Sequence, residues 1–236
     1  MTAATLIIFD CDGVLVDSER LMQDIDLQMI AGLGWPITRE EIFEQHLGRS
    51  EPFVDANIAR HIGHPVPESF VLERRRAHAE AFRQNLAAVP GVEAVIARLQ
   101  AAGFGTCVAS SGTHERIRLV LGLTGLRHYF ADRIFSADDV EHSKPAPDLF
   151  LHAAATLGYE PGACIVVEDS PSGVTAAKAA GMRAIAFCAL TPVSAMQGAD
   201  VVITGMEELE ATIETLVGGP SAPSTSATQA DGTHPW

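Results

Sequence analysis

The stretch LIIFDCDGVLVDSE, residues 6–19, decides the fold. Its apolar run from Leu6 to Phe9 has the length of a short strand and ends in Asp10 and Asp12, which only Cys11 separates. An uninterrupted apolar run is typical of a parallel strand buried on both faces, and ligands bind beyond the carboxyl ends of such strands. Carboxylates clustered there cannot all stay ionised without a compensating cation. The stretch therefore predicts a buried strand that ends at a charged site.

Residues 89–217 alternate between helical and strand patterns. Apolar strand-like runs occupy residues 105–110, 133–136, 163–169, 183–188 and 199–204. Helical patterns fill the intervals, at residues 91–103, 113–125, 147–158, 172–181 and 206–217. This alternation predicts an α/β fold with a doubly wound, Rossmann-like parallel sheet covered on both faces. The strand at residues 6–9 belongs to the same sheet.

Residues 17–88 carry only helical signals. Thr38 and Glu41 form a capping box, Gly48 is a helix stop, Ser50 caps the next helix, and a long helix spans residues 68–86. We predict an all-helical cap domain at residues 17–88, inserted into a core domain of residues 1–16 and 89–217. Residues 218–236, rich in Ser, Pro, Thr and Gly, predict a disordered tail.

Composition restricts the partners. The formal net charge is -14, with 30 acidic and 16 basic residues, which argues against nucleic acid and anionic membrane surfaces. Neither a signal peptide nor an apolar run near the ~18 residues of a membrane span is visible. Cys11, Cys107, Cys164 and Cys188 match no zinc spacing. We expect reduced cysteines, a cytoplasmic location and a monomer.

Polar residues follow four of the predicted strands. Beyond Asp10 and Asp12, these are Ser110, Ser111, Lys144, Glu168 and Asp169. Oxygen ligands of this kind suit Mg²⁺, which takes one or two carboxylates together with substrate phosphate. A carboxylate also acts as a nucleophile, and a second one transfers protons. Lys144 would neutralise charge, while Ser110 and nearby backbone N–H groups would hold phosphate oxygens.

Four motifs resemble those of the haloacid dehalogenase superfamily. FDCDGVLVDSE resembles its first motif, VASSG its second, SKPAPDLF its third and VVEDSPSGVTAAKAAGM its fourth. The resemblance extends over residues 6–217. The helical insertion resembles the cap of the subgroup that contains β-phosphoglucomutase, sugar-phosphate phosphatases and phosphoglycolate phosphatases.

The resemblance implies a role for each site residue. Asp10 is the expected nucleophile and Asp12 the expected general acid and base. The resemblance places Mg²⁺ between the Asp10 side chain, the Asp12 backbone carbonyl, Asp169 and Glu168, the last directly or through water. Ser110 and Lys144 are the expected phosphate ligands, with backbone N–H groups of Cys11, Asp12 and Ser111.

The same resemblance separates possible reactions. Dehalogenases lack the second acid, Asp12, and phosphonate hydrolysis relies on a cap lysine, whereas residues 17–88 contain no lysine. β-Phosphoglucomutase has a histidine where this chain has Met22. We therefore expect a phosphatase for a small phosphomonoester that works through an aspartyl-phosphate. A phosphosugar mutase, a phosphoglycolate phosphatase and a non-catalytic phosphometabolite-binding regulatory module are the alternatives.

The cap is expected to select the substrate. The candidate contacts are Arg49, Ser50, and one or two of the three consecutive arginines Arg74, Arg75 and Arg76. Consecutive helical residues point about 100° apart, so the three arginines cannot all face one cleft. His46 is expected to be a helix-end residue, and Asp17 with Ser18 the N-cap of the first cap helix.

Overall fold

The computed structural model describes residues 5–189 and 191–218. The predicted tail, apart from Gly218, lies outside the described residues. Within them, six strands form a single sheet in the order β3-β2-β1-β4-β5-β6. The strands are β1 (Leu6–Phe9), β2 (Gly105–Ser110), β3 (Ile134–Ser136), β4 (Cys164–Glu168), β5 (Arg183–Phe187) and β6 (Val201–Ile203).

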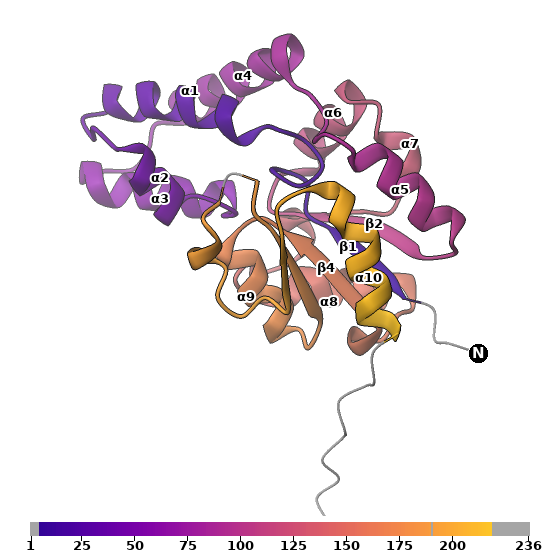
Figure 1. Ribbon diagram of the computed structural model, residues 1–236. Coiled ribbons are helices and arrows are strands. Elements are labelled where there is room, and N and C mark those ends of the chain that lie inside the picture. Colours follow the sequence, from indigo (N-terminus) through magenta and orange to yellow (C-terminus); the bar gives the residue numbers. More distant parts are fainter. Residues whose placement is uncertain (1–4, 190, 219–236) are drawn as a thin grey trace, which may run out of the picture.

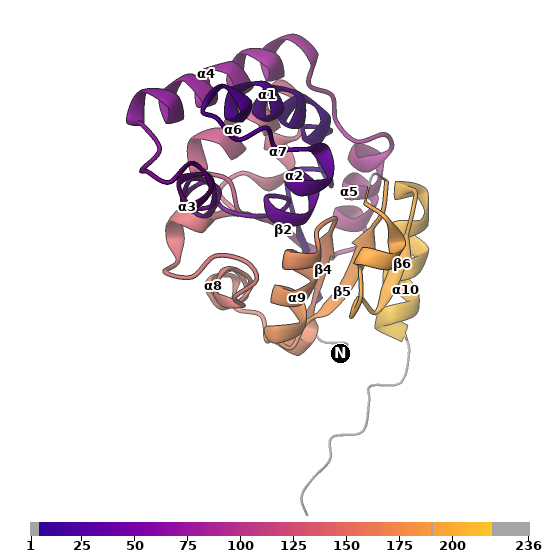
Figure 2. The ribbon, with the colours of Figure 1, turned by 90° about the vertical axis from the view of Figure 1, so that its left-hand side faces the viewer.

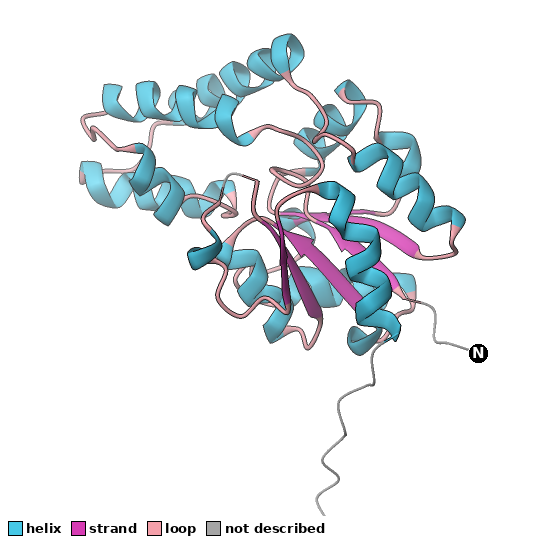
Figure 3. Cartoon of the chain, in the orientation of Figure 1, coloured by secondary structure: helices cyan, strands magenta, loops and turns pink. Residues whose placement is uncertain are grey.

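The sheet is parallel throughout, as the sequence predicts. β1 pairs with β2 on one side and with β4 on the other, so the sheet grows outward from β1 in both directions. The strand order reverses direction next to β1, and this topological switch point is where doubly wound sheets bind ligands. The carboxyl ends of β1, β2 and β4 consequently lie side by side (Figure 3).

Helices cover both faces of the sheet because its strands are apolar on both. Ile7 and Phe9 belong to one buried cluster, and Leu6 and Ile8 to the other, as the two-residue period of a strand requires. The first cluster packs against α5 (Val92–Ala101), α6 (His114–Leu123), α7 (Arg127–Phe130) and α10 (Leu209–Gly218). The second packs against α8 (Asp148–Leu157) and α9 (Pro171–Ala179).

Four further helices follow β1 before the chain returns to the sheet. They are α1 (Glu19–Gly32), α2 (Arg39–Gln45), α3 (Glu51–Ile62) and α4 (Glu68–Asn85). Ile30, Trp35 and Ile58 belong to a separate buried cluster among these helices. Figures 1 and 2 show the group lying over the edge of the sheet at which β1 and β4 end. Each described helix is too short or too polar to cross a membrane.

Several helix ends agree with the sequence and others differ. Thr38 and Glu41 form the predicted capping box, and Thr113 caps α6 by accepting from the N–H of Arg116. Ser18 and Ser50 occupy the N-cap positions of α1 and α3, but their hydroxyl groups are directed to Asp12 and Ser143. The predicted stop at Gly48 is wrong, because α2 ends at Gln45. In both serines a tertiary contact of the hydroxyl group replaces the helix-capping hydrogen bond that the sequence favours.

Candidate active site

Asp10 follows β1 directly and is 6% exposed. Its backbone N–H donates to the carbonyl oxygen of Val167 in β4 at 3.0 Å, which continues the sheet one residue beyond the strand. The Asp10 carboxylate is thereby fixed at the carboxyl edge of the sheet. Burial raises the pKa of Asp10 to about 7, with further increments from the charges of Glu168 and Asp12 and an opposing effect of Lys144.

Lys144 reaches the same edge from the loop after β3 and is 2% exposed. Its Nζ donates to Asp10 Oδ1 at 2.6 Å, to Glu168 Oε1 at 2.7 Å and to the Ala109 carbonyl oxygen at 3.1 Å. Burial acts to lower the pKa of Lys144, but the charges of Asp10 and Glu168 outweigh it and raise that pKa. The ammonium group therefore stays charged between two buried carboxylates.

The acids at the ends of β1 and β4 form a cluster. Asp10, Glu168 and Asp169 each offer a carboxylate oxygen, and these oxygens lie within 4.8 Å of one another. Burial raises the pKa of Asp169, and the charges of Glu19, Glu168, Asp10 and Asp12 add to the shift. All the donors are hard oxygen atoms, which fits Mg²⁺. A divalent cation would offset the mutual repulsion of these buried carboxylates.

Glu168 and Asp169 differ in what they already bind. Glu168 Oε1 accepts from Lys144, and Oε2 accepts from both the N–H and the hydroxyl of Ser170, each at 2.8 Å. Asp169 packs directly against the backbone of Gly13, where an added Cβ would lie 1.8 Å from Asp169 Oδ2. Asp169 is thus the less engaged of the two acids and the better suited to bind a cation directly.

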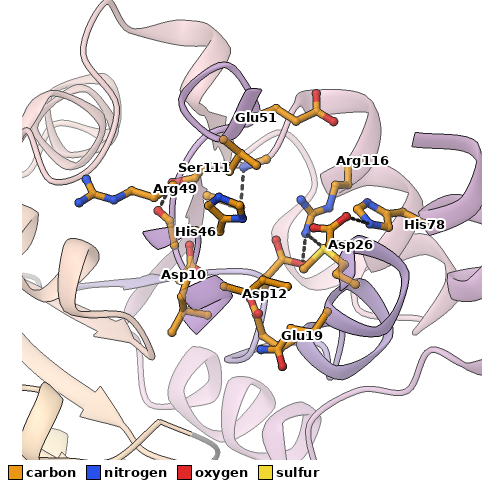
Figure 4. A pocket seen from close by; sticks show the side chains of 18 of the residues that line it. Asp10, Asp12, Glu19, Asp26, His46, Arg49, Glu51, His78, Ser111 and Arg116 are labelled. Carbon is orange, nitrogen blue, oxygen red and sulfur yellow. Dashed lines mark hydrogen bonds and ion pairs between the residues drawn. The ribbon is translucent and has the colours of Figure 1, made fainter. Parts of the chain in front are cut away.

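Asp12 is held by two residues to which the sequence analysis gave no such role. Ser18 Oγ lies 2.5 Å from Asp12 Oδ1. Arg116 Nη2 lies 2.6 Å from the same oxygen (Figure 4). Ser18 occupies the predicted N-cap position of α1, but its hydroxyl donates to Asp12 instead of capping the helix. The motif that contains Ser18 offered a signal for this contact. Arg116 comes from α6, and the sequence carried no signal for its contact, because only the tertiary structure brings it to Asp12.

The acid Glu19 completes the wall beside Asp12 and was also missed. It begins α1 and lines the same cavity as Asp10 and Asp12. Burial raises its pKa to about 8, and the charge of Asp12 adds to this effect. At neutral pH the Glu19 carboxyl group is therefore mostly protonated, which lets it lie near two carboxylates.

The predicted phosphate ligands lie at the end of β2. Ser110 is buried and its Oγ accepts from the N–H of Gly112 at 3.1 Å. Ser111 Oγ donates to the Gly48 carbonyl oxygen in the cap at 2.9 Å. Ser110, Ser111 and Gly112 line a cavity of about 90 Å³ together with Asp10, Asp12 and Asp169. Cys11, whose backbone N–H was another candidate beside those of Asp12 and Ser111, is fully buried.

The cap residues proposed from the sequence separate into two groups. Arg49 and Arg74 line this cavity, Arg49 with its guanidinium over the Phe53 ring and Arg74 paired with Asp55 at 2.7 Å. Arg75 is exposed, pairs with Glu51 and lines a neighbouring cavity between α4 and α6. Ser50 Oγ lies 3.0 Å from Ser143 Oγ, on another part of the surface between cap and core.

Comparison with known proteins identifies the family. The model of the haloacid dehalogenase-like hydrolases matches residues 4–181. The chain is 34% identical over 212 residues to hexitol phosphatase B of Escherichia coli, which covers 86% of this chain and 93% of that protein. It is 31% identical over 191 residues to 6-phosphogluconate phosphatase of the same organism, covering 80% and 85%.

A solved structure agrees with these sequence matches. It is a haloacid dehalogenase-like protein of unknown function from Agrobacterium tumefaciens, 33% identical, with a TM-score of 0.75. The match covers 91% of this chain and 99% of the other. Sequence and fold thus point to one family. The chain therefore belongs to the haloacid dehalogenase-like hydrolases.

Proposed function

We propose that this hydrolase is a Mg²⁺-dependent phosphatase that cleaves a small phosphomonoester through an aspartyl-phosphate on Asp10. One observation carries the proposal: four strand ends deliver Asp10, Asp12, Ser110, Lys144 and Asp169 to a single small site. The named relatives, a hexitol phosphatase and a 6-phosphogluconate phosphatase, support the same reaction class.

The first half-reaction is attack by an Asp10 carboxylate oxygen on phosphorus. The bond from phosphorus to the ester oxygen breaks as the new bond forms, and Asp12 gives its proton to the departing alkoxide. Lys144 Nζ lies 2.6 Å from Asp10 Oδ1, so it orients the nucleophile and balances the charge of the incoming phosphoryl group. Ser110 and the N–H groups after β2 bind phosphoryl oxygens.

The second half-reaction returns the enzyme to its starting state. Asp12, now ionised, takes a proton from water, and the resulting hydroxide attacks phosphorus and releases inorganic phosphate from Asp10. Asp12 serves both steps, and Ser18 and Arg116 hold one of its oxygens in place. Water can reach the phosphorus atom in this step because the alcohol has left the site.

Asp10, Asp169 and the Asp12 backbone carbonyl would hold Mg²⁺, and Glu168 would contribute through water. When bound, the cation offsets the repulsion between these acids and stabilises charge on the phosphoryl oxygens. We assign Glu168 the role of a support for Lys144 and for the loop after β4, since its two oxygens already accept three hydrogen bonds.

The cap helices of residues 17–88 would enclose a small phosphorylated metabolite, and Arg49 and Arg74 line the enclosure. The mutase alternative is disfavoured because Met22 stands at the sequence position of the mutase histidine, and its Sδ lies 2.9 Å from Arg116 Nη2. We further propose a cytoplasmic monomer. Four buried free thiols are consistent with a reducing compartment.

The test is hydrolysis of p-nitrophenyl phosphate and of small phosphate esters with Mg²⁺ or with EDTA. We expect turnover only with the cation. Asp10→Asn should abolish turnover, whereas Asp132→Asn, which removes one exposed carboxylate outside the site, should not. A phosphorylated peptide containing Asp10 should be recovered after acid quench of the wild type. Turnover by Asp10→Asn at the wild-type rate would refute the covalent route.

A further inference from the structure

A fifth strand end lies at the same edge of the sheet as the acid cluster. β5 pairs in parallel with β4, so its carboxyl end lies beside the end of β4, where Glu168 and Asp169 stand. Thr191 follows β5, which ends at Phe187, and is 5% exposed. Neither the motifs of the sequence nor the proposed reaction gives this buried hydroxyl group a role.

The hydroxyl group of Thr191 contacts the backbone of Asp169. Its Oγ1 donates to the Asp169 carbonyl oxygen at 2.7 Å, and the contact is buried. A backbone carbonyl oxygen only accepts, so the threonine is the donor. A buried carbonyl oxygen that loses such a partner is costly to leave unpaired. The hydrogen bond therefore ties the segment after β5 to the segment after β4.

The sheet alone does not hold Asp169. The pairing of β4 with β1 ends at Val167, and its pairing with β5 ends at Glu168. The next residue beyond Asp169 is Ser170, which is already the N-cap of α9. Asp169 thus lies between a strand and a helix, where the hydrogen bonds of neither element set the direction of its peptide group. That direction depends on tertiary contacts.

Two contacts from different elements fix Asp169. Its carboxylate packs against Gly13, where an added Cβ would lie 1.8 Å from Oδ2. Its carbonyl oxygen is held by Thr191. Because the peptide group is planar, fixing the carbonyl oxygen fixes the rotation about the Cα–C bond of Asp169. The side chain then leaves a backbone that is held on both sides. Glu168 differs, since Lys144 holds its carboxylate directly.

We propose that Thr191 is a positioning residue for the cation site, whose hydroxyl group holds the Asp169 peptide so that the carboxylate stays beside Asp10 and Glu168. The inference rests on the proposed Mg²⁺-dependent phosphatase function and adds a residue to it. Replacing a residue that orients a metal ligand without touching the metal commonly costs about 10-fold to 100-fold in metal affinity. Thr191 acts on the affinity for Mg²⁺ and leaves the chemical step to Asp10 and Asp12.

The test measures Mg²⁺ binding to the full chain, by isothermal titration calorimetry and by Tm as a function of Mg²⁺ concentration. Thr191→Val keeps the size of the side chain, removes the donor and should weaken Mg²⁺ binding by about 10-fold. Thr191→Ser keeps the hydroxyl group and should bind Mg²⁺ as the wild type does. Thr191→Ala is a second variant without the hydroxyl group. It replaces Thr191→Val if that variant does not fold, and it should weaken Mg²⁺ binding as well.

Thr106→Val is the matched control for loss of stability. Thr106 is 1% exposed and lies near the start of β2, at the opposite edge of the sheet. Its hydroxyl oxygen accepts from Gln100 Nε2 at 2.7 Å. Removing this acceptor should lower Tm, because a buried donor loses its partner. The affinity for Mg²⁺ should stay unchanged, since Thr106 is remote from the acid cluster.

Hydrolysis of p-nitrophenyl phosphate gives a second readout. In Thr191→Val the Mg²⁺ concentration for half-maximal turnover should rise by the same factor as the Kd for Mg²⁺. The kcat at saturating Mg²⁺ should return to nearly the wild-type value, because Asp10 and Asp12 are unchanged. A general distortion of the site would lower kcat at every Mg²⁺ concentration.

The outcomes separate the positioning role from the reaction. The role is refuted if Thr191→Val binds Mg²⁺ as tightly as the wild type, if Thr191→Ser loses as much affinity as Thr191→Val, or if Thr106→Val loses it equally. A loss of kcat in Thr191→Val that persists at saturating Mg²⁺ also refutes it. A wild type that neither binds Mg²⁺ nor cleaves p-nitrophenyl phosphate would instead overturn the proposed function, and the role of Thr191 with it.

Discussion

At the scale of single residues, the arrangement around Asp12 explains how one carboxylate serves two proton transfers. Ser18 and Arg116 both bind Oδ1 of Asp12, from the start of α1 and from α6. Two contacts to a single oxygen fix the rotation of the carboxylate, so its other oxygen has a defined direction. General acid–base catalysis depends on that direction as well as on protonation.

Ser18→Ala and Arg116→Met should therefore reduce turnover of alkyl phosphates by about 10-fold to 100-fold, within the range of general acid–base catalysis. The loss should be smaller for p-nitrophenyl phosphate, whose leaving group departs without a proton. Steady-state rates with both substrates test this, with Arg118→Met as control, an exposed arginine on the same helix. An equal loss of turnover with both substrates would show that Ser18 and Arg116 do not act by positioning Asp12.

At the scale of secondary-structure elements, the loop between α2 and α3 is where cap and core meet. The Gly48 carbonyl oxygen accepts from Ser111 after β2 and from Ser172 in α9. Gly48 has a φ of 69°, and a Cβ added there would lie 2.2 Å from Ser170 Oγ. Glycine is required twice at this position, for its backbone conformation and for the close approach of the two parts.

Gly48→Ala should keep the cap from seating on the core. Misplacement of cap contacts by an ångström costs about 100-fold in rate, so kcat/KM should fall on that order. Gly63→Ala is the matched control, since Gly63 has a φ of 80° with open space around its Cβ position. Both variants should lower Tm through backbone strain, and only Gly48→Ala should lose activity. A comparable loss of activity in both variants would show that backbone strain, and not the seating of the cap, causes the loss.

At the scale of the whole molecule, the acid cluster couples folding to pH and to metal. Burial raises the pKa of Asp10 to about 7 and of Glu19 to about 8, and also raises that of Asp169. At these three carboxyl groups the folded protein therefore binds more protons than the unfolded chain above about pH 4. By linkage, these groups favour folding at low pH, and that contribution is lost as pH rises through about 7 to 8.

We expect the Tm of EDTA-treated protein to fall between pH 6.5 and pH 8.5, by about 2–4 °C for each kcal/mol lost. Mg²⁺ should raise Tm more at pH 8.5, where its ligands are deprotonated. Thermal unfolding with and without Mg²⁺ measures both effects. Asp169→Asn should reduce both the pH dependence and the effect of Mg²⁺. An unchanged Mg²⁺ effect in that variant would remove Asp169 from the set of ligands.

The sequence by itself determined the sheet and the chemistry at its edge. Uninterrupted apolar strands alternating with helices require a parallel sheet covered on both faces, and the residues directly after β1, β2 and β4 must meet at one edge. Asp10, Ser110 and Asp169 were predictable for this reason, because their positions follow from local period and chain order. The helical character of residues 17–88 was likewise predictable from the local sequence pattern.

Only the tertiary structure decided which cap side chains face that edge. Three consecutive arginines look alike in sequence, yet Arg74 lines the cavity while Arg75 pairs with Glu51 in the open. The contact of Arg116 with Asp12 likewise depends on how α6 packs beneath the cap. A helix fixes the directions of its side chains relative to one another, but its rotation about its own axis is set by packing against its neighbours.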